Sequence, residues 1–123
     1  MKFALITAAL LSSLGLASVA NAASIEKGQA LVEKGNCASC HGAGLNAPVA
    51  PAYPKLAGQP ADYLYYALRA YQVGGSNSNF GRVNAIMVSQ VQGTPDVKAY
   101  SQQDLQDMAA YIASLPGTMV IKK

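Results

Sequence analysis

The stretch Cys37-Ala38-Ser39-Cys40-His41 (CASCH) contains both cysteines and the only histidine of the 123-residue chain. The two thiols are three positions apart and the imidazole follows directly, so all of these soft ligands lie on one short turn. Nothing elsewhere in the sequence can join them, because no further cysteine or histidine exists. The chemistry of this turn must use these three groups, and any additional ligand must come from another residue type.

Cys-x-x-Cys-His is the attachment motif of c-type haem. On a short turn, two thiols at this spacing can both reach the two vinyl groups on one porphyrin edge and form thioethers. The adjacent imidazole then offers a nitrogen to the iron. The motif therefore predicts one covalently attached haem c, with Cys37 and Cys40 as the attachment residues and His41 as an axial iron ligand.

Four other uses of the motif compete with this interpretation. A thioredoxin-like redox pair requires a βαβ context, which the chain lacks. A zinc site takes four ligands and an iron–sulfur cluster normally takes four cysteines, whereas three soft ligands exist here. A disulfide between Cys37 and Cys40 would close a very small loop and would stabilise the fold little. These alternatives fit less of the sequence than haem attachment does.

The first 22 residues have the pattern of a secretory signal peptide. Lys2 supplies a positive start, a mostly apolar segment runs from Phe3 to Val19, and Ala20-Asn21-Ala22 provides the small-x-small cleavage pattern. A membrane-spanning helix is the alternative, but the apolar segment is short and lacks a basic stop-transfer flank. We expect residues 1–22 to be removed on export to the periplasm, leaving residues 23–123 as the mature domain.

Length and charge limit what the mature chain can be. The remaining 101 residues suffice for one small domain. Lys2 is the only charged residue of the first 22, so the formal charge of +3 becomes +2 after cleavage. This charge is too low to indicate binding to nucleic acid or to an anionic membrane surface. We expect no membrane span after cleavage.

Three segments carry the start and stop signals of helices. The first runs from about residue 24 to 34, with Ser24 as a cap and Ile25, Gly28 and Val32 on one side. The second runs from about 60 to 73, with an apolar stripe formed by Leu64, Ala67, Leu68 and Tyr71. The third begins at the capping sequence Ser101–Asp104 and ends at Pro116-Gly117, with an apolar face formed by Leu105, Met108, Ala109, Ile112 and Leu115.

Between these helices lie two long stretches, Gly42–Gln59 and Gly74–Tyr100, to which the sequence assigns no helix. No run of alternating polar and apolar residues indicates a sheet. Loops of this length inside a compact domain usually need something else to organise them, and a large apolar prosthetic group would do so. The prediction is an all-α domain with three main helices and long loops wrapped around one covalently bound haem.

Four stretches resemble the class I c-type cytochromes. They are GQALVEKGNCASCHG (Gly28–Gly42), YPKLAGQPADYLYYAL (Tyr53–Leu68), GRVNAIM (Gly81–Met87) and SQQDLQDMAAYIASLP (Ser101–Pro116). They occur in the family order and span nearly the whole mature chain. The chain looks most like one domain of the bacterial cytochromes of the c-four type, which carry two such domains in tandem, and their mono-haem relatives.

The resemblance implies a fold in which the first and last helices cross near Gly28 and Tyr111. It also implies that the carbonyl of Pro54 accepts a hydrogen bond from His41, which would fix the imidazole ring and raise its basicity. The alternative for Pro54 is that it is one more proline of a proline-rich loop.

A methionine is the natural candidate for the sixth iron ligand, because thioether sulfur is a soft neutral donor that raises the haem potential. Met108 lies on the apolar face of the last predicted helix, where core packing explains it, and Met119 follows the Pro-Gly stop. Met87 lies in the long stretch after the second helix and matches the family's ligand in GRVNAIM. The alternative for Met87 is a methionine that fills a gap under a loop.

Arg82 and Asn84 precede this methionine and could reach a haem propionate, since guanidinium pairs well with carboxylate. A solvated loop charge is the alternative for Arg82. The segment VSQVQGTPDVKAY (Val88–Tyr100) departs from the family pattern, because it is longer than the resemblance leads us to expect. The resemblance therefore does not predict the surface that the residues after Met87 form toward a partner.

These observations predict a periplasmic mono-haem electron carrier, with His/Met-ligated iron, that passes single electrons between redox protein partners. No group resembles general acid–base machinery, so we do not expect an enzyme. Two alternatives stay open: a ligand-binding or peroxide-reacting haem protein in which Met87 does not hold the iron, and a haem subunit of a redox enzyme complex. The sequence does not identify the electron donor and acceptor, the reduction potential or the oligomeric state.

Overall fold

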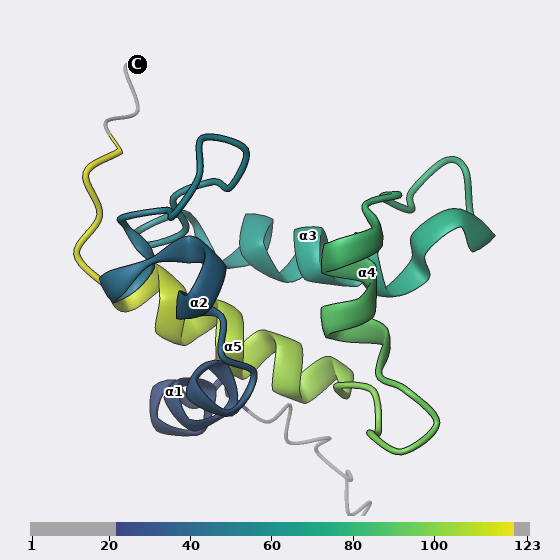
Figure 1. Ribbon diagram of the computed structural model, residues 1–123. Helices are drawn as coiled ribbons and strands as arrows, with labels where there is room; N and C mark the ends of the chain where they lie inside the picture. The colour runs from purple at the N-terminus through teal and green to yellow at the C-terminus, as the bar shows by residue number, and fades with distance from the viewer. Residues whose placement is uncertain (1–21, 120–123) are drawn as a thin grey trace, which may run out of the picture.

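The computed structural model describes residues 22–119, and the helices in this range are joined by irregular chain (Figure 1). They are α1 (Ile25–Lys34), α2 (Ala38–His41), α3 (Ala61–Val73), α4 (Ala85–Gln92) and α5 (Gln102–Ser114), with 3₁₀ turns at Ala43–Leu45 and Gly74–Ser76. The described residues contain no β-strand beyond an isolated bridge between Thr94 and Val97. The prediction of an all-α fold is therefore confirmed.

The predicted signal peptide lies outside the described residues, except for Ala22 at its end. Within residues 22–119, none of the helices has the length and apolar character needed to cross a membrane.

The first and the third predicted helices begin at the expected caps. The Oγ of Ser24 accepts a hydrogen bond from the Lys27 N–H at 3.2 Å, and α1 ends at Gly35. At α5, the Oγ of Ser101 accepts from the Asp104 N–H at 3.1 Å, while the Asp104 carboxylate accepts from the Ser101 N–H at 2.8 Å. This reciprocal pair satisfies two backbone donors that the first turn of a helix would otherwise leave unpaired.

Helices α1 and α5 cross where Gly28 faces Asp107 and Tyr111, as the resemblance implied. A Cβ built on Gly28 would overlap the Asp107 carbonyl and lie 2.9 Å from the Tyr111 Cβ, so only glycine permits this approach. The buried Asp107 carboxylate also accepts from the Ser24 N–H at 2.7 Å, which ties the start of α1 to α5. The crossing buries Gly28 and Val32, whereas Ile25, on the same side of α1, is 52% exposed.

One apolar cluster forms the core of the described residues. Its seven buried members come from α1, the first 3₁₀ turn, α3 and α5, and they are Val32, Leu45, Leu64, Leu105, Met108, Ala109 and Ile112. Helix α5 contributes four of these side chains, so it is the central element against which α1 and α3 pack. The core is small for a domain of this length, because part of the interior is taken up by the cavity described below.

The stretch from Gly74 to Tyr100, left without helix by the sequence, contains α4. The side chain of Asn84 caps this helix by accepting from the Met87 N–H at 3.0 Å. Of its eight residues only Val91 is buried, so the helix has no apolar stripe of the usual spacing. Tertiary packing against α3 and the Asn84 cap form a helix here that periodicity does not predict.

Candidate functional site

A cavity of about 390 Å³ lies between α2, α3, α4 and α5. This volume is within the range of about 300 to 1,000 Å³ that is typical of ligand and cofactor sites. Figure 1 shows α2 and α4 well apart from each other, with α3 behind them and α5 below. The cavity lining includes every site residue that the sequence singled out: Cys37, Cys40, His41, Pro54, Arg82, Asn84 and Met87.

The segment CASCH forms one wall of the cavity. Cys37 is the residue before α2, Cys40 and His41 lie in its single turn, and Gly42 ends the turn with φ of 78°. Both cysteines are free thiols and half-buried. Burial raises the pKa of the Cys37 thiol, so this side chain stays protonated near neutral pH. The turn therefore presents two thiols from one short piece of chain.

The imidazole of His41 is fixed by a single hydrogen bond. His41 is 5% exposed, and its Nδ1 lies 2.8 Å from the carbonyl oxygen of Pro54. Because a carbonyl can only accept, Nδ1 must carry the proton and donate it. Nε2 is then the nitrogen whose lone pair can bind a metal ion. Tyr53 supports the ring from the side in an edge-on arrangement, with centroids 6.4 Å apart.

Two methionines lie in the cavity lining, one from α4 and one from α5. Met87 is half-buried in the first turn of α4, and the buried Val91, which follows one turn later, lines the cavity with it. Met108 is 2% exposed and packs within the core cluster of α5. The sequence prediction that Met108 is a core residue is confirmed, although its side chain also borders the cavity. Met119 is not among the lining residues.

The predicted apolar stripe of α3 faces the cavity. Leu64, Ala67, Leu68 and Tyr71 all line it, yet only Leu64 is buried and the other three keep part of their surface exposed. An apolar helix face is normally covered by other side chains. In the described residues no side chains cover this face of α3 completely. A large apolar group in the cavity would cover it.

Arg82 lies at the exposed edge of the cavity between two tyrosines. Its guanidinium carbon is 5.7 Å from the ring centroid of Tyr63 and 5.5 Å from that of Tyr71. Its Nη2 donates to the Tyr63 hydroxyl at 3.4 Å, and this hydrogen bond raises the pKa of the guanidinium. Asn84 uses its side-chain oxygen to cap α4, which leaves its NH₂ group as the part that can donate toward the cavity.

The sequence did not single out Tyr63 and Tyr100, although both line the cavity. Tyr63 is half exposed and belongs to no apolar stripe. Burial raises the pKa of the Tyr100 hydroxyl, and Cys37 and Asp104 add to the effect. These tyrosines are positioned by tertiary packing between α3, α4 and the chain before α5, so no local spacing could have indicated them.

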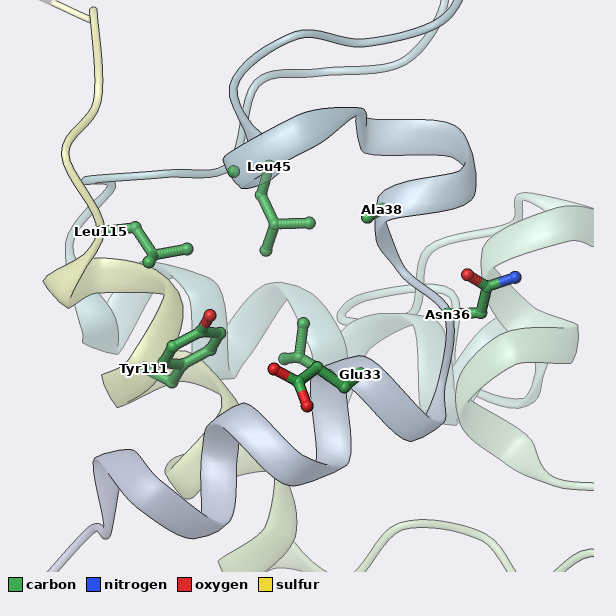
Figure 2. Close-up of a pocket in the computed structure, with 8 residues that line it drawn as sticks. Glu33, Asn36, Ala38, Leu45, Tyr111 and Leu115 are labelled. Atoms are coloured by element: carbon green, nitrogen blue, oxygen red, sulfur yellow. The ribbon is translucent and has the colours of Figure 1, made fainter.

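A second hollow of about 260 Å³ lies against α1, α2 and α5 (Figure 2), and neither the cysteines nor the histidine is among the residues that line it. Leu45 and Leu115 flank it, and Glu33, Asn36 and Tyr111 stand at its edges. It offers no thiol, imidazole or thioether to a ligand. The larger cavity is therefore the candidate site.

Comparison with known proteins agrees with this arrangement. The chain matches the family model described as cytochrome c over residues 25–116. It is 40% identical over 114 residues to cytochrome c4 of Stutzerimonas stutzeri, covering 89% of this chain and 50% of that protein. It is 36% identical over 80 residues to cytochrome c-554(548) of Halomonas halodenitrificans, covering 65% of this chain and 84% of that protein.

The fold matches a solved structure as well. The crystal structure of reduced recombinant cytochrome c4 from Pseudomonas stutzeri superposes with a TM-score of 0.63 at 36% sequence identity, covering 79% of this chain and 48% of that one. The chain thus spans about half the length of the cytochromes c4 it matches. The likeness to a single domain of a larger relative was expected from the four sequence stretches.

Proposed function

The chain belongs to the cytochrome c family, and on that basis we propose that it carries one covalently bound haem c and transfers single electrons between redox proteins. The observation that carries this proposal is the composition of one cavity. Two thiols and a histidine with a free Nε2 line it from α2, and a thioether lines it from α4. These are the donors that would attach a haem covalently and hold its iron through a nitrogen and a sulfur.

The cysteines and the histidine have separate roles. Cys37 and Cys40 would each add a thiol across a vinyl group, which forms a thioether and leaves no vinyl double bond. Haem supplies an iron that accepts or gives up one electron. His41 holds its own proton on Nδ1 toward Pro54 and offers Nε2 to the metal, and the hydrogen bond makes the imidazole a stronger donor.

Met87 is proposed as the second axial ligand. It lies in the α4 lining of the cavity, whereas Met108 is engaged in the core cluster on α5. A thioether favours the reduced form of the iron and so raises the reduction potential. The rim residues Arg82 and Asn84 would donate hydrogen bonds to the haem carboxylates, since both retain N–H groups that the protein does not use fully.

With His41 and Met87 both holding the iron, a bound haem would offer no open position to a substrate. The histidine of this chain is already assigned as a ligand, and no second one exists to act as a general base. Electron transfer to redox partners is therefore the function that these residues support best. Export to the periplasm after removal of residues 1–22 is part of the same proposal, because the signal pattern and extracytoplasmic haem attachment belong together.

Two measurements on the purified haem-loaded protein test this function. Haem that stays with the polypeptide through acid-acetone extraction is the expected result of thioether bonds, and haem that extracts cleanly would overturn the attachment. Carbon monoxide added to the reduced protein should leave the spectrum unchanged. Ready binding would instead favour a ligand-binding haem protein.

A further inference from the structure

Gln72, in the last turn of α3, joins three segments that are distant in sequence. Its side-chain NH₂ group donates to the carbonyl of Tyr100 at 2.6 Å and to the carbonyl of Val91 at 3.4 Å. Its side-chain oxygen accepts from Arg69 on the same helix. One half-buried amide therefore connects α3 with the end of α4 and with the chain just before α5.

The orientation of this amide follows from its partners. Two backbone carbonyls need donors and the Arg69 guanidinium needs an acceptor, so NH₂ must face the carbonyls and the oxygen must face Arg69. A glutamine satisfies all of these groups at once. Glutamate has the same shape but offers only acceptors, which would oppose two carbonyl oxygens.

A second hydrogen bond runs in the reverse direction between the same helices. The side chain of Gln92, the last residue of α4, donates to the backbone carbonyl of Gln72 at 2.9 Å. In the chain before α4, three residues ahead of Ala85, the Arg82 N–H donates to the Ala70 carbonyl at 2.9 Å. The end of α4 and the chain that leads into it are thus both hydrogen-bonded to the last turn of α3.

These contacts matter because α4 has little else to hold it. Val91 is its only buried residue, and the eight-residue helix is too short to be stable by itself. The residues Val88–Tyr100, which include the second half of α4, form the segment that is longer than the family resemblance led us to expect. Gln72 donates to two carbonyls within this segment, at Val91 and at Tyr100, and so holds it against α3.

We propose that Gln72 is a positioning residue for Met87: its amide holds the second half of α4 against α3, and this keeps the thioether at the cavity. Met87 and Val91 lie one turn apart in the cavity lining. Movement of the helix backbone at Val91 would therefore also displace the Met87 side chain. The inference rests on the proposed function, in which Met87 is an axial ligand.

Gln72→Glu in the haem-loaded protein tests the proposal, because it preserves the shape and the Arg69 contact but removes both donated hydrogen bonds. The population in which Met87 has left the iron should rise at least about tenfold. This rise should be measurable as carbon monoxide binding to the reduced protein and as weakening of the long-wavelength sulfur band of the oxidised protein. Hydrogen exchange of the α4 amides should accelerate by a similar factor, while α1 and α5 stay protected.

Two further variants make the result specific. Gln92→Ala, at an exposed position, removes only the reciprocal hydrogen bond and should give a smaller effect of about fivefold in the same direction. Gln29→Glu introduces the same charge on the exposed face of α1, where the glutamine side chain donates a hydrogen bond to Glu33, and should leave the sulfur band and α4 exchange unchanged.

The possible outcomes distinguish a failure of the Gln72 proposal from a failure of the proposed electron-carrier function. If wild type excludes carbon monoxide and Gln72→Glu does so equally, with α4 exchange unchanged, Gln72 does not position Met87 and the electron-carrier function stands. If wild type itself binds carbon monoxide freely, Met87 is not a firm ligand and both proposals fall.

Discussion

The Nδ1–H of His41 donates a hydrogen bond to the carbonyl oxygen of Pro54, across 2.8 Å. The two residues lie thirteen positions apart, on opposite ends of the proline-containing segment that follows α2. The bond fixes which nitrogen of the buried imidazole carries the proton and therefore which one faces the cavity. It also couples the backbone of an exposed loop to the electronic character of the proposed iron ligand.

Loosening this loop should change the reduction potential. Pro54→Gly keeps the carbonyl but frees the backbone that holds it, so the hydrogen bond weakens and His41 becomes a poorer donor. The oxidised iron then loses stabilisation, and a redox titration should show a higher potential than in wild type. Pro51→Gly, at an exposed proline outside the cavity lining, is the control and should leave the potential unchanged. Equal shifts in the two variants would mean that general loop flexibility, and not the His41 bond, sets the potential.

The helix crossing at Gly28 predicts a loss of stability on the smallest substitution. Gly28→Ala places a methyl group against the Asp107 carbonyl and should lower the free energy of unfolding by about 1 to 3 kcal/mol. Urea unfolding of the haem-loaded protein measures this change. Gln29→Ala, on the exposed side of α1, should alter stability by less than about 0.5 kcal/mol. A Gly28→Ala protein as stable as wild type would show that α1 and α5 can separate at no cost.

The Arg82 guanidinium, held between Tyr63 and Tyr71, predicts a charge effect on the potential. A fixed cation at the cavity rim disfavours the more positive oxidised iron, so Arg82→Leu should lower the reduction potential. Arg82→Lys retains the charge without the planar stacking group and should fall between Leu and wild type. If Arg82→Leu titrates at the wild-type potential, Arg82 is an ordinary solvated surface charge.

The sequence predicted the parts of this fold that have local signals. Caps and apolar spacing located α1, α3 and α5, because Ser24 and Ser101 satisfy backbone donors in their own helices. The side chains of CASCH indicated their chemistry because they are adjacent in the chain. The long stretches between the predicted helices indicated that a large apolar group organises them, and in the structure the apolar stripe of α3 faces a cavity.

The sequence did not predict the parts that depend on tertiary contacts. Helix α4 has one buried residue and several β-branched ones, so neither periodicity nor propensity indicated it. Gln72 looked like any polar residue of an amphipathic helix, and its acceptors lie 19 and 28 positions away. Such long-range hydrogen bonds leave no local pattern that a single sequence can reveal.

Replacement of the proposed sulfur ligand addresses the choice between an electron carrier and a ligand-binding haem protein. Met87→Ala removes a donor that favours reduced iron, so the reduction potential should fall and the reduced protein should bind carbon monoxide readily. Met108→Leu is the matched control, because Met108 is the other methionine of the cavity lining and leucine conserves its volume. It should cost less than about 1.5 kcal/mol of stability and leave the spectrum unchanged.

The long-wavelength absorption of the oxidised protein reports sulfur bound to ferric haem, so recording it for these two variants side by side identifies the sulfur ligand. The band should be present in wild type and in Met108→Leu and absent in Met87→Ala. A band that survives in Met87→Ala and disappears in Met108→Leu would make Met108 the ligand and contradict the assignment of Met87.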